Sequence, residues 1–122
     1  MTESCVEAGA RLGTFVGPLE LRNPVLPASG CFGPELDPLL PVDRLGAVVT
    51  KTVFRDVRSG NPAHRLAEAR DGMLNSVGIP SLGLTRWRAE MLPRFASCGA
   101  PVIVSLGGLA EDDYRLLAAR LR

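Results

Sequence analysis

The sequence is poor in cysteine, in net charge and in long apolar runs, and each shortage excludes a class of protein. Its cysteines are Cys5, Cys31 and Cys98, an odd number with no CxxC spacing, which argues for reduced thiols and against a disulfide frame or a zinc site. The formal net charge is only +1, so no overall field recruits nucleic acid or an anionic membrane. No apolar run approaches the ~20 residues of a membrane span. We therefore expect a cytoplasmic protein with no metal, no nucleic-acid partner and no membrane segment.

Lysine is the scarcest charged residue. The chain contains thirteen arginines and one lysine, Lys51. A compact ammonium and a planar guanidinium differ in hydration and hydrogen-bond geometry, so a lone lysine suggests a position where arginine cannot substitute. Chance or codon bias explains the same composition equally well.

Residues 1–13 are predicted to be a flexible leader and residues 14–122 the folded part. The first dozen residues contain two acids and no apolar core, so they are not a signal peptide.

The folded part alternates predicted strands and helices. Two short strands are expected around Gly17-Pro18, and a helical piece near 35–40. Apolar strands are expected at 24–29, 46–51 and 101–105, with a helix from Leu84 that Pro93 should break and a last helix from Glu111 whose apolar face holds Tyr114, Leu117, Ala118 and Leu121. Residues 53–82 have no period and are predicted to be a long loop.

Buried apolar strands that alternate with helices predict an α/β fold with a parallel sheet. Three such strands leave bare edges and helix faces with nothing opposite them. An eight-unit βα barrel needs about 250 residues. We therefore expect an incomplete barrel of about the first three βα units.

All three predicted strands end in polar residues, at Ser29, at Lys51-Thr52 and at Ser105. In βα barrels the chemistry lies at these carboxyl ends. Together they predict a rim that binds a polar ligand, with Lys51 pointing into the barrel mouth, where it meets an anion or else is partly desolvated. The alternative is a lysine that reaches out to solvent.

A second candidate site is the Asn75-Ser76 pair, which lies between Gly72 and Gly78. Its amide and hydroxyl suit a planar polar ligand, although these residue types also form ordinary turns. The only histidine, His64, lies in an irregular polar stretch and is expected at the surface.

Four ordered motifs and the third strand resemble class 1 dihydroorotate dehydrogenases. They are Asn23–Gly33 (NPVLPASGCFG), Leu45–Thr52 (LGAVVTKT), Arg58–Pro62 (RSGNP), Gly72–Gly78 (GMLNSVG) and the strand in Pro101–Gly108 (PVIVSLGG). The resemblance runs from about Phe15 to Arg122, and its wording is closer to the class 1B branch than to class 1A.

This resemblance implies a TIM barrel, an (β/α)8 fold with FMN at its mouth, and oxidation of dihydroorotate to orotate in pyrimidine synthesis. Carried over by position, the FMN-binding residues are Ser29, Lys51, Thr52 and Ser105. The orotate-binding residues are Lys51, Asn75, Ser76, Val77, Gly78 and Ile79. A cation near N1 and C2 of the flavin favours its reduced form, which is the role expected of Lys51.

The family's catalytic base belongs to a later loop, so no catalytic residue is expected in this chain and the base is expected downstream of Arg122. A class 1B enzyme also implies a second subunit with FAD and an iron–sulfur cluster, and the complete enzyme is expected to be a homo-oligomer. Two alternatives stay open. One is another flavin oxidoreductase of pyrimidine bases, such as a dihydropyrimidine dehydrogenase domain; the other is a non-catalytic fragment that holds no stoichiometric FMN.

Overall fold

Two short parallel ladders form the centre of the computed structural model, which describes residues 12–122. β3 (Val48–Val49) pairs with β7 (Val102–Ile103), and β4 (Val53–Phe54) pairs with β8 (Leu106–Gly107). The predicted leader lies almost wholly outside the described residues. The α/β class and the parallel direction of the second and third predicted strands are confirmed, but residues 12–122 form no closed barrel.

The two ladders run along the same pair of chain segments and are separated at Thr50, which is fully buried. Backbone bonds continue on both sides of the break: Thr50 N–H donates to the carbonyl of Ile103 at 3.0 Å, and Val53 N–H donates to that of Ser105 at 2.8 Å. At the break, Thr50 Oγ1 accepts the N–H of Ser105 at 3.2 Å. A side chain thus replaces one ladder bond, and the backbone is free to bend at Lys51 and Thr52.

The strand predicted at 24–29 is not regular. The segment runs beside β3, where Gly46 N–H donates to the carbonyl of Val25 at 3.0 Å and Gly30 N–H to that of Val49 at 3.2 Å. Pro24 and Pro27 have no N–H to donate. The prediction was therefore right about position and wrong about a continuous ladder.

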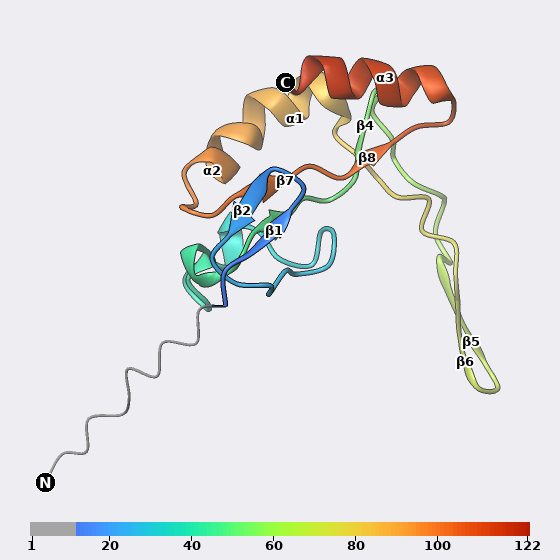
Figure 1. Cartoon of the computed structure of the whole chain (residues 1–122). Helices are drawn as coiled ribbons and strands as arrows, with labels where there is room; N and C mark the ends of the chain where they lie inside the picture. Colours follow the sequence, from blue (N-terminus) through green and yellow to red (C-terminus); the bar gives the residue numbers. More distant parts are fainter. Residues whose placement is uncertain (1–11) are drawn as a thin grey trace, which may run out of the picture.

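Three helices cover one side of the strands (Figure 1). They are α1 (Gly83–Glu90), α2 (Leu92–Ala96) and α3 (Glu111–Arg120). Trp87 of α1 and Phe95 of α2 stack with ring centroids 6.3 Å apart and close the core over the strands. The break expected from Pro93 is confirmed, because α1 ends before Met91 and Pro93 lies in the first turn of α2. No helix within residues 12–122 is long and apolar enough to cross a membrane.

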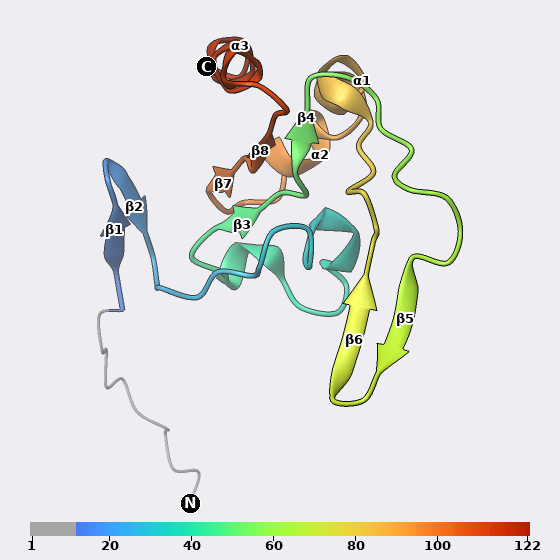
Figure 2. The ribbon, with the colours of Figure 1, turned by 90° about the vertical axis from the view of Figure 1, so that its right-hand side faces the viewer.

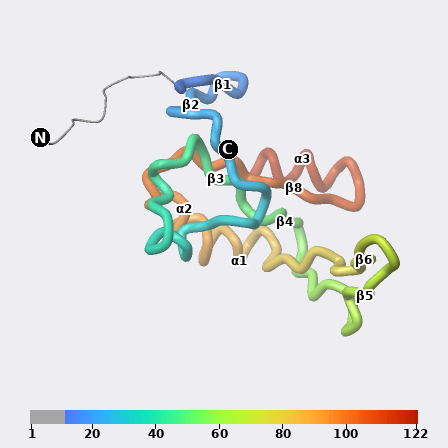
Figure 3. The backbone as a smooth tube through the Cα atoms, turned by 90° about the horizontal axis from the view of Figure 1, so that it is seen from below, coloured from blue at the N-terminus to red at the C-terminus, as the bar shows by residue number. Residues whose placement is uncertain are grey.

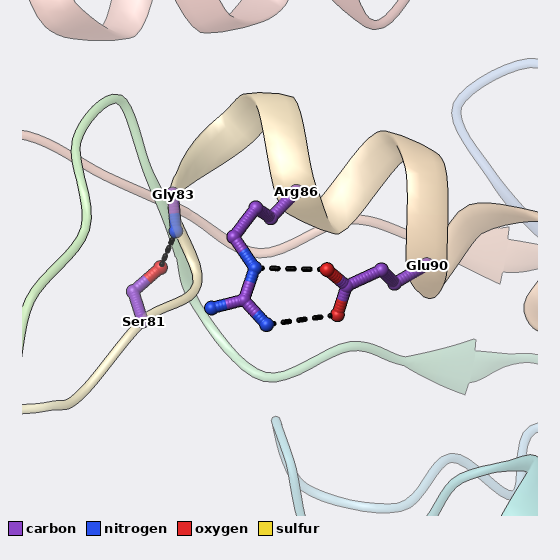
Figure 4. A network of polar contacts seen from close by, with 4 residues as sticks. All are labelled: Ser81, Gly83, Arg86 and Glu90. Atoms are coloured by element: carbon purple, nitrogen blue, oxygen red, sulfur yellow. Dashed lines mark hydrogen bonds and ion pairs between the residues drawn. The ribbon is translucent and has the colours of Figure 1, made fainter.

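Two side-chain contacts stabilise the ends and the outer face of α1 (Figure 4). The hydroxyl of Ser81 accepts the N–H of Gly83 at 3.3 Å, which satisfies one free donor at the start of the helix. Arg86 forms two hydrogen bonds with Glu90, at 2.8 and 3.1 Å, one turn further along. This pairing lowers the pKa of Glu90 and raises that of Arg86. Both side chains are exposed, so the pair fixes local geometry more than overall stability.

The last helix begins where its acids were expected, but its predicted apolar face is narrower. Leu117 is fully buried and Leu121 is partly buried. Tyr114 is 46% exposed and Ala118 is exposed, so these two residues of the predicted face do not pack on the core.

Asp113 caps α3 by accepting the backbone N–H groups of Leu109 and Ala110 at 3.0 and 3.3 Å. We expect Asp113→Ala to lower the free energy of unfolding by about 1 kcal/mol, the usual cost of losing a cap. Asp112→Ala is the matched control, because it removes the same charge from the same turn and Asp112 lies at the surface, 3.8 Å from Arg115. Urea unfolding of the complete protein measures both. Equal losses in the two variants would assign the effect to helix electrostatics and exclude the cap.

Two hairpins lie on opposite sides of the strands (Figures 2 and 3). β1 (Thr14–Val16) and β2 (Leu19–Leu21) form the first, as predicted around Gly17. β5 (Leu66–Ala69) and β6 (Gly72–Asn75) form the second, within the predicted long loop. The second hairpin was missed, and every residue of its strands is exposed. The expected helical piece near 35–40 is a short 3-10 turn, Pro34–Leu36, followed by a second at Val42–Arg44.

Candidate functional site

A cavity of about 470 Å³ lies beside the carboxyl end of β3. Its lining comes from four segments: Gly30, Phe32, Gly33 and Glu35; Lys51 and Thr52; Val57 and Arg58; and Pro80, Ser81, Leu82, Trp87, Met91 and Phe95. The walls are largely apolar and aromatic, and the charged groups are two cations and one carboxylate. A cavity of this kind suits a flat, mostly apolar ligand with a polar or anionic edge.

Lys51 lies on this cavity, and its position depends on close contact with Gly30. Gly30 has a φ of +73°, and a Cβ placed on it would lie 3.0 Å from Lys51 Cβ and 3.2 Å from Lys51 Cα. The ammonium is exposed and, within residues 12–122, forms no ion pair. The group expected at the barrel mouth is therefore present and available to an anion, although it is not desolvated.

The three hydroxyl residues of the predicted rim lie at the same end of the strands as Lys51. Ser29 Oγ donates to the backbone carbonyl of Thr50 at 2.7 Å. The hydroxyls of Thr52 and Ser105 form a hydrogen bond of 3.0 Å. Ser29 can therefore only accept from a ligand, whereas the Thr52–Ser105 pair still has one proton to donate.

The predicted substrate stretch, residues 75–79, lies along the base of the β5–β6 hairpin and does not line the cavity. Ser76 accepts hydrogen bonds from the Asn61 side chain at its hydroxyl, 2.7 Å, and at its carbonyl, 3.1 Å. Asn61 N–H donates to the carbonyl of Val77 at 3.1 Å. Asn75 ends β6 with its side chain exposed. The motif Arg58–Pro62 thus organises the backbone of the motif Gly72–Gly78.

Ile79 has the most unusual backbone of this stretch. Its φ is +40°, and Gly78 before it has a φ of +73°. Isoleucine avoids the left-handed region because its branched side chain crowds the backbone there. Strain of this kind costs about 1–3 kcal/mol and is concentrated at ligand-binding sites.

Arg58 is the residue that sequence reasoning missed. Its backbone makes a two-bond bridge with Ser81, and its side chain donates to the carbonyl of Gly78 at 3.2 Å. It therefore joins the cavity wall to the predicted substrate stretch. The only signal in the sequence was its place at the start of Arg58–Pro62, to which no role had been assigned.

The donors around the cavity fit the ring of a flavin. The aromatic wall matches a planar apolar body, and the lysine with the Thr52–Ser105 hydroxyl pair offers donors for a polar edge. Within residues 12–122, no three histidine, cysteine, aspartate or glutamate side chains lie close enough together to hold a metal ion.

Comparison with known proteins agrees with this chemistry. The family model described as "Dihydroorotate dehydrogenase" matches residues 11–122. The catalytic subunit of dihydroorotate dehydrogenase B (NAD(+)) from Listeria monocytogenes serotype 4a (strain HCC23) is 40% identical over 113 residues, which are 91% of this chain and 37% of that protein. The protein of the same name from Endomicrobium trichonymphae is 47% identical over 102 residues, which are 82% of this chain and 33% of that protein.

The chain therefore spans only 33–37% of the length of these relatives. The match nevertheless covers the strand ends, the cavity and the hairpin in one continuous range. The resemblance carried by the sequence motifs is confirmed: the chain belongs to the dihydroorotate dehydrogenase family.

Proposed function

We propose that the protein containing this chain oxidises dihydroorotate to orotate in pyrimidine synthesis, with FMN as its flavin. The observation that carries this proposal is the cavity of about 470 Å³, whose largely apolar lining includes the cations Lys51 and Arg58. Dihydroorotate is a small ring with a carboxylate, and such an anion needs a cation within reach. Glu35 is the only carboxylate in the lining, so the two cations leave the cavity with a net positive charge.

The residues of this chain bind and orient, and we assign no proton transfer to them. Lys51 has three donors, enough for both the polar edge of the flavin and the carboxylate of the substrate. Ser29, Thr52 and Ser105 supply the remaining flavin contacts at the strand ends. Asn75 and the stretch Ser76–Ile79 hold the pyrimidine. When bound, FMN supplies the hydride acceptor at N5, and we place the base that removes the neighbouring proton outside residues 1–122.

Residues 14–122 are proposed to be part of a complete TIM barrel. The parallel ladders β3–β7 and β4–β8, with helices on one side, support this architecture. Because the relatives are named as catalytic subunits of an NAD(+) enzyme, we further propose a partner subunit with FAD and an iron–sulfur cluster. We also propose a homo-oligomeric catalytic subunit in the cytoplasm, where Cys31 and Cys98, which are free thiols in the structure, would stay reduced.

Turnover by the complete protein tests the function. Dihydroorotate and dihydrouracil are compared with a dye as electron acceptor, and the released flavin is identified by chromatography. We expect FMN in the purified protein and a kcat/KM for dihydroorotate higher by a factor of about 10³ or more, because a site built for a carboxylate rejects the analogue that lacks it. Equal turnover of the two substrates would favour a dihydropyrimidine dehydrogenase-like enzyme, and a preparation without flavin would contradict both.

A further inference from the structure

Arg58 connects the base of the β5–β6 hairpin to the end of β4. Its backbone N–H and carbonyl each form a 2.9 Å hydrogen bond with the backbone of Ser81. These two bonds bring together the ends of the long segment between Arg58 and Ser81. Its guanidinium lies over the ring of Phe54 in β4, with Cζ 4.4 Å from the ring centroid. From this position it donates to the carbonyl of Gly78 at 3.2 Å. The side chain of Arg58 therefore contacts both β4, at Phe54, and the segment that returns from the hairpin, at Gly78.

The guanidinium is held by these contacts and by no carboxylate. Within the described part of the chain, Arg58 forms no ion pair. Its Nε is buried without a hydrogen-bond partner. An arrangement that leaves a buried donor unsatisfied is costly, so stability alone does not account for it. The Phe54 ring beneath the guanidinium restricts its position, which is what a positioning role requires.

The carbonyl that Arg58 binds belongs to the strained turn. Gly78 and Ile79 are consecutive residues with positive φ, and residues 12–122 contain no cis peptide bond. In a trans peptide the carbonyl and the following N–H point in opposite directions. Fixing the Gly78 carbonyl on Arg58 therefore also fixes the direction of the Ile79 N–H. That N–H donates to no backbone carbonyl among residues 12–122, and Ile79 is 47% exposed, so the N–H is free to bond water or a ligand.

We propose that Arg58 is a positioning residue for the substrate. By binding the carbonyl of Gly78, it holds the Gly78–Ile79 peptide in the one orientation that presents the Ile79 N–H to the bound pyrimidine. This inference rests on the proposed function, since it assigns the ligand of that N–H. It adds a requirement beyond the flavin contacts: the conformation of residues 75–79, the predicted substrate stretch, depends on the side chain of Arg58.

The test uses the complete protein with Arg58→Ala, Arg58→Lys and, as matched control, Arg70→Ala. Arg70 lies in the exposed turn of the same hairpin and makes no hydrogen bond or ion pair within residues 12–122. We expect Arg58→Ala to lower kcat/KM per bound FMN by about 10- to 100-fold, the worth of one charged hydrogen bond. Arg58→Lys keeps the charge but loses the fork, so it should recover less than half of this loss on a logarithmic scale. Added guanidinium ion should partly restore Arg58→Ala and leave Arg70→Ala unaffected.

Amide hydrogen exchange of residues 76–80 supplies a readout that does not need turnover. Exchange should be faster in Arg58→Ala than in Arg70→Ala, even if the wild-type protein oxidises no dihydroorotate, in which case the proposed function fails and the loop positioning stands. Equal exchange and equal kcat/KM in the two alanine variants would overturn the inference. It is also overturned if Arg58→Ala loses activity only in proportion to lost FMN, or if guanidinium gives no rescue while Arg58→Lys is fully active.

Discussion

Replacing Lys51 with arginine should lower kcat/KM for dihydroorotate in the complete protein by about 10²-fold or more, although the charge is kept. The backbone of Lys51 is fixed by Gly30, which packs against its Cα and Cβ. The longer, planar guanidinium cannot place a donor where the ammonium lies, and a misplacement of about 1 Å at a reacting centre costs roughly this much. The thermal midpoint should change little, because Lys51 is exposed and forms no ion pair within residues 12–122.

Two further variants separate the charge from its geometry. Lys51→Met removes the ammonium and keeps most of the stem, so it should lose at least as much activity as Lys51→Arg. Arg70→Lys is the control for exchanging one cation for the other at an exposed site, and it should be indistinguishable from wild type. Steady-state kinetics and the flavin absorbance of each purified variant provide the measurement. Near-normal turnover in Lys51→Arg would show that any cation suffices and would remove the main argument for the site.

The sequence was most informative where burial and periodicity coincide. Val48 lies in the core, as the β-branched run around it indicated, and the helix that starts near Leu84 stops where Pro93 requires. These features depend on neighbours in the chain, so local patterns reveal them. Val53 is also buried, in β4, although it was predicted to lie in the long loop, so that prediction was wrong. The resemblance added the order of the motifs and the identity of the rim residues, and the family match over residues 11–122 agrees with it.

The β5–β6 hairpin has neither the burial nor the periodicity that revealed those elements. Its strands, Leu66–Ala69 and Gly72–Asn75, contain no β-branched residue and bury neither face. Its central turn residues are Arg70 and Asp71, neither of which has a positive φ. The Asp71-Gly72 pair is therefore shifted by one residue from the two central positions in which that dipeptide marks a tight hairpin turn. Hydrogen bonds at the base stabilise the hairpin instead: the Asn61 side chain donates to Ser76, and the Ser76 N–H donates to the carbonyl of Arg65. Contacts between residues this far apart in the sequence cannot be inferred from the spacing of residue types along the chain.

The same reason explains what was missed in the site. Lys51 could be placed at a strand end because alternation along one strand is a local property. Arg58 bonds to Gly78, which lies 20 residues further along the chain. Its importance depends on where the segment between them returns to the strands. The hydroxyls of Ser29, Thr52 and Ser105 lie at one end of the strands, and the bonds that engage them depend on the break in the ladder at Thr50.

Gly30→Ala should damage both the fold and the site. The added Cβ would meet Lys51 at 3.0 Å, on a backbone whose φ of +73° already disfavours alanine. The conformational part costs about 1–2 kcal/mol, and the contact with Lys51 adds to it because the atoms met include the backbone Cα of Lys51 as well as its Cβ and Cγ. We expect a total loss of about 2–4 kcal/mol in the free energy of unfolding.

Two other glycines divide this loss into its parts. Gly17 has a φ of +57° with nothing within 4 Å of an added Cβ, so Gly17→Ala measures the conformational cost alone. Gly72 has neither a positive φ nor a neighbour within 4 Å, so Gly72→Ala should stay within about 0.5 kcal/mol of wild type. The additional loss in the free energy of unfolding of Gly30→Ala, compared with Gly17→Ala, then measures the steric cost of the contact with Lys51. Because this steric contact displaces the ammonium of Lys51, kcat/KM per bound FMN should fall in Gly30→Ala and stay constant in the other two variants. An unchanged kcat/KM in all three would mean that Gly30 stabilises the fold and does not determine the position of Lys51.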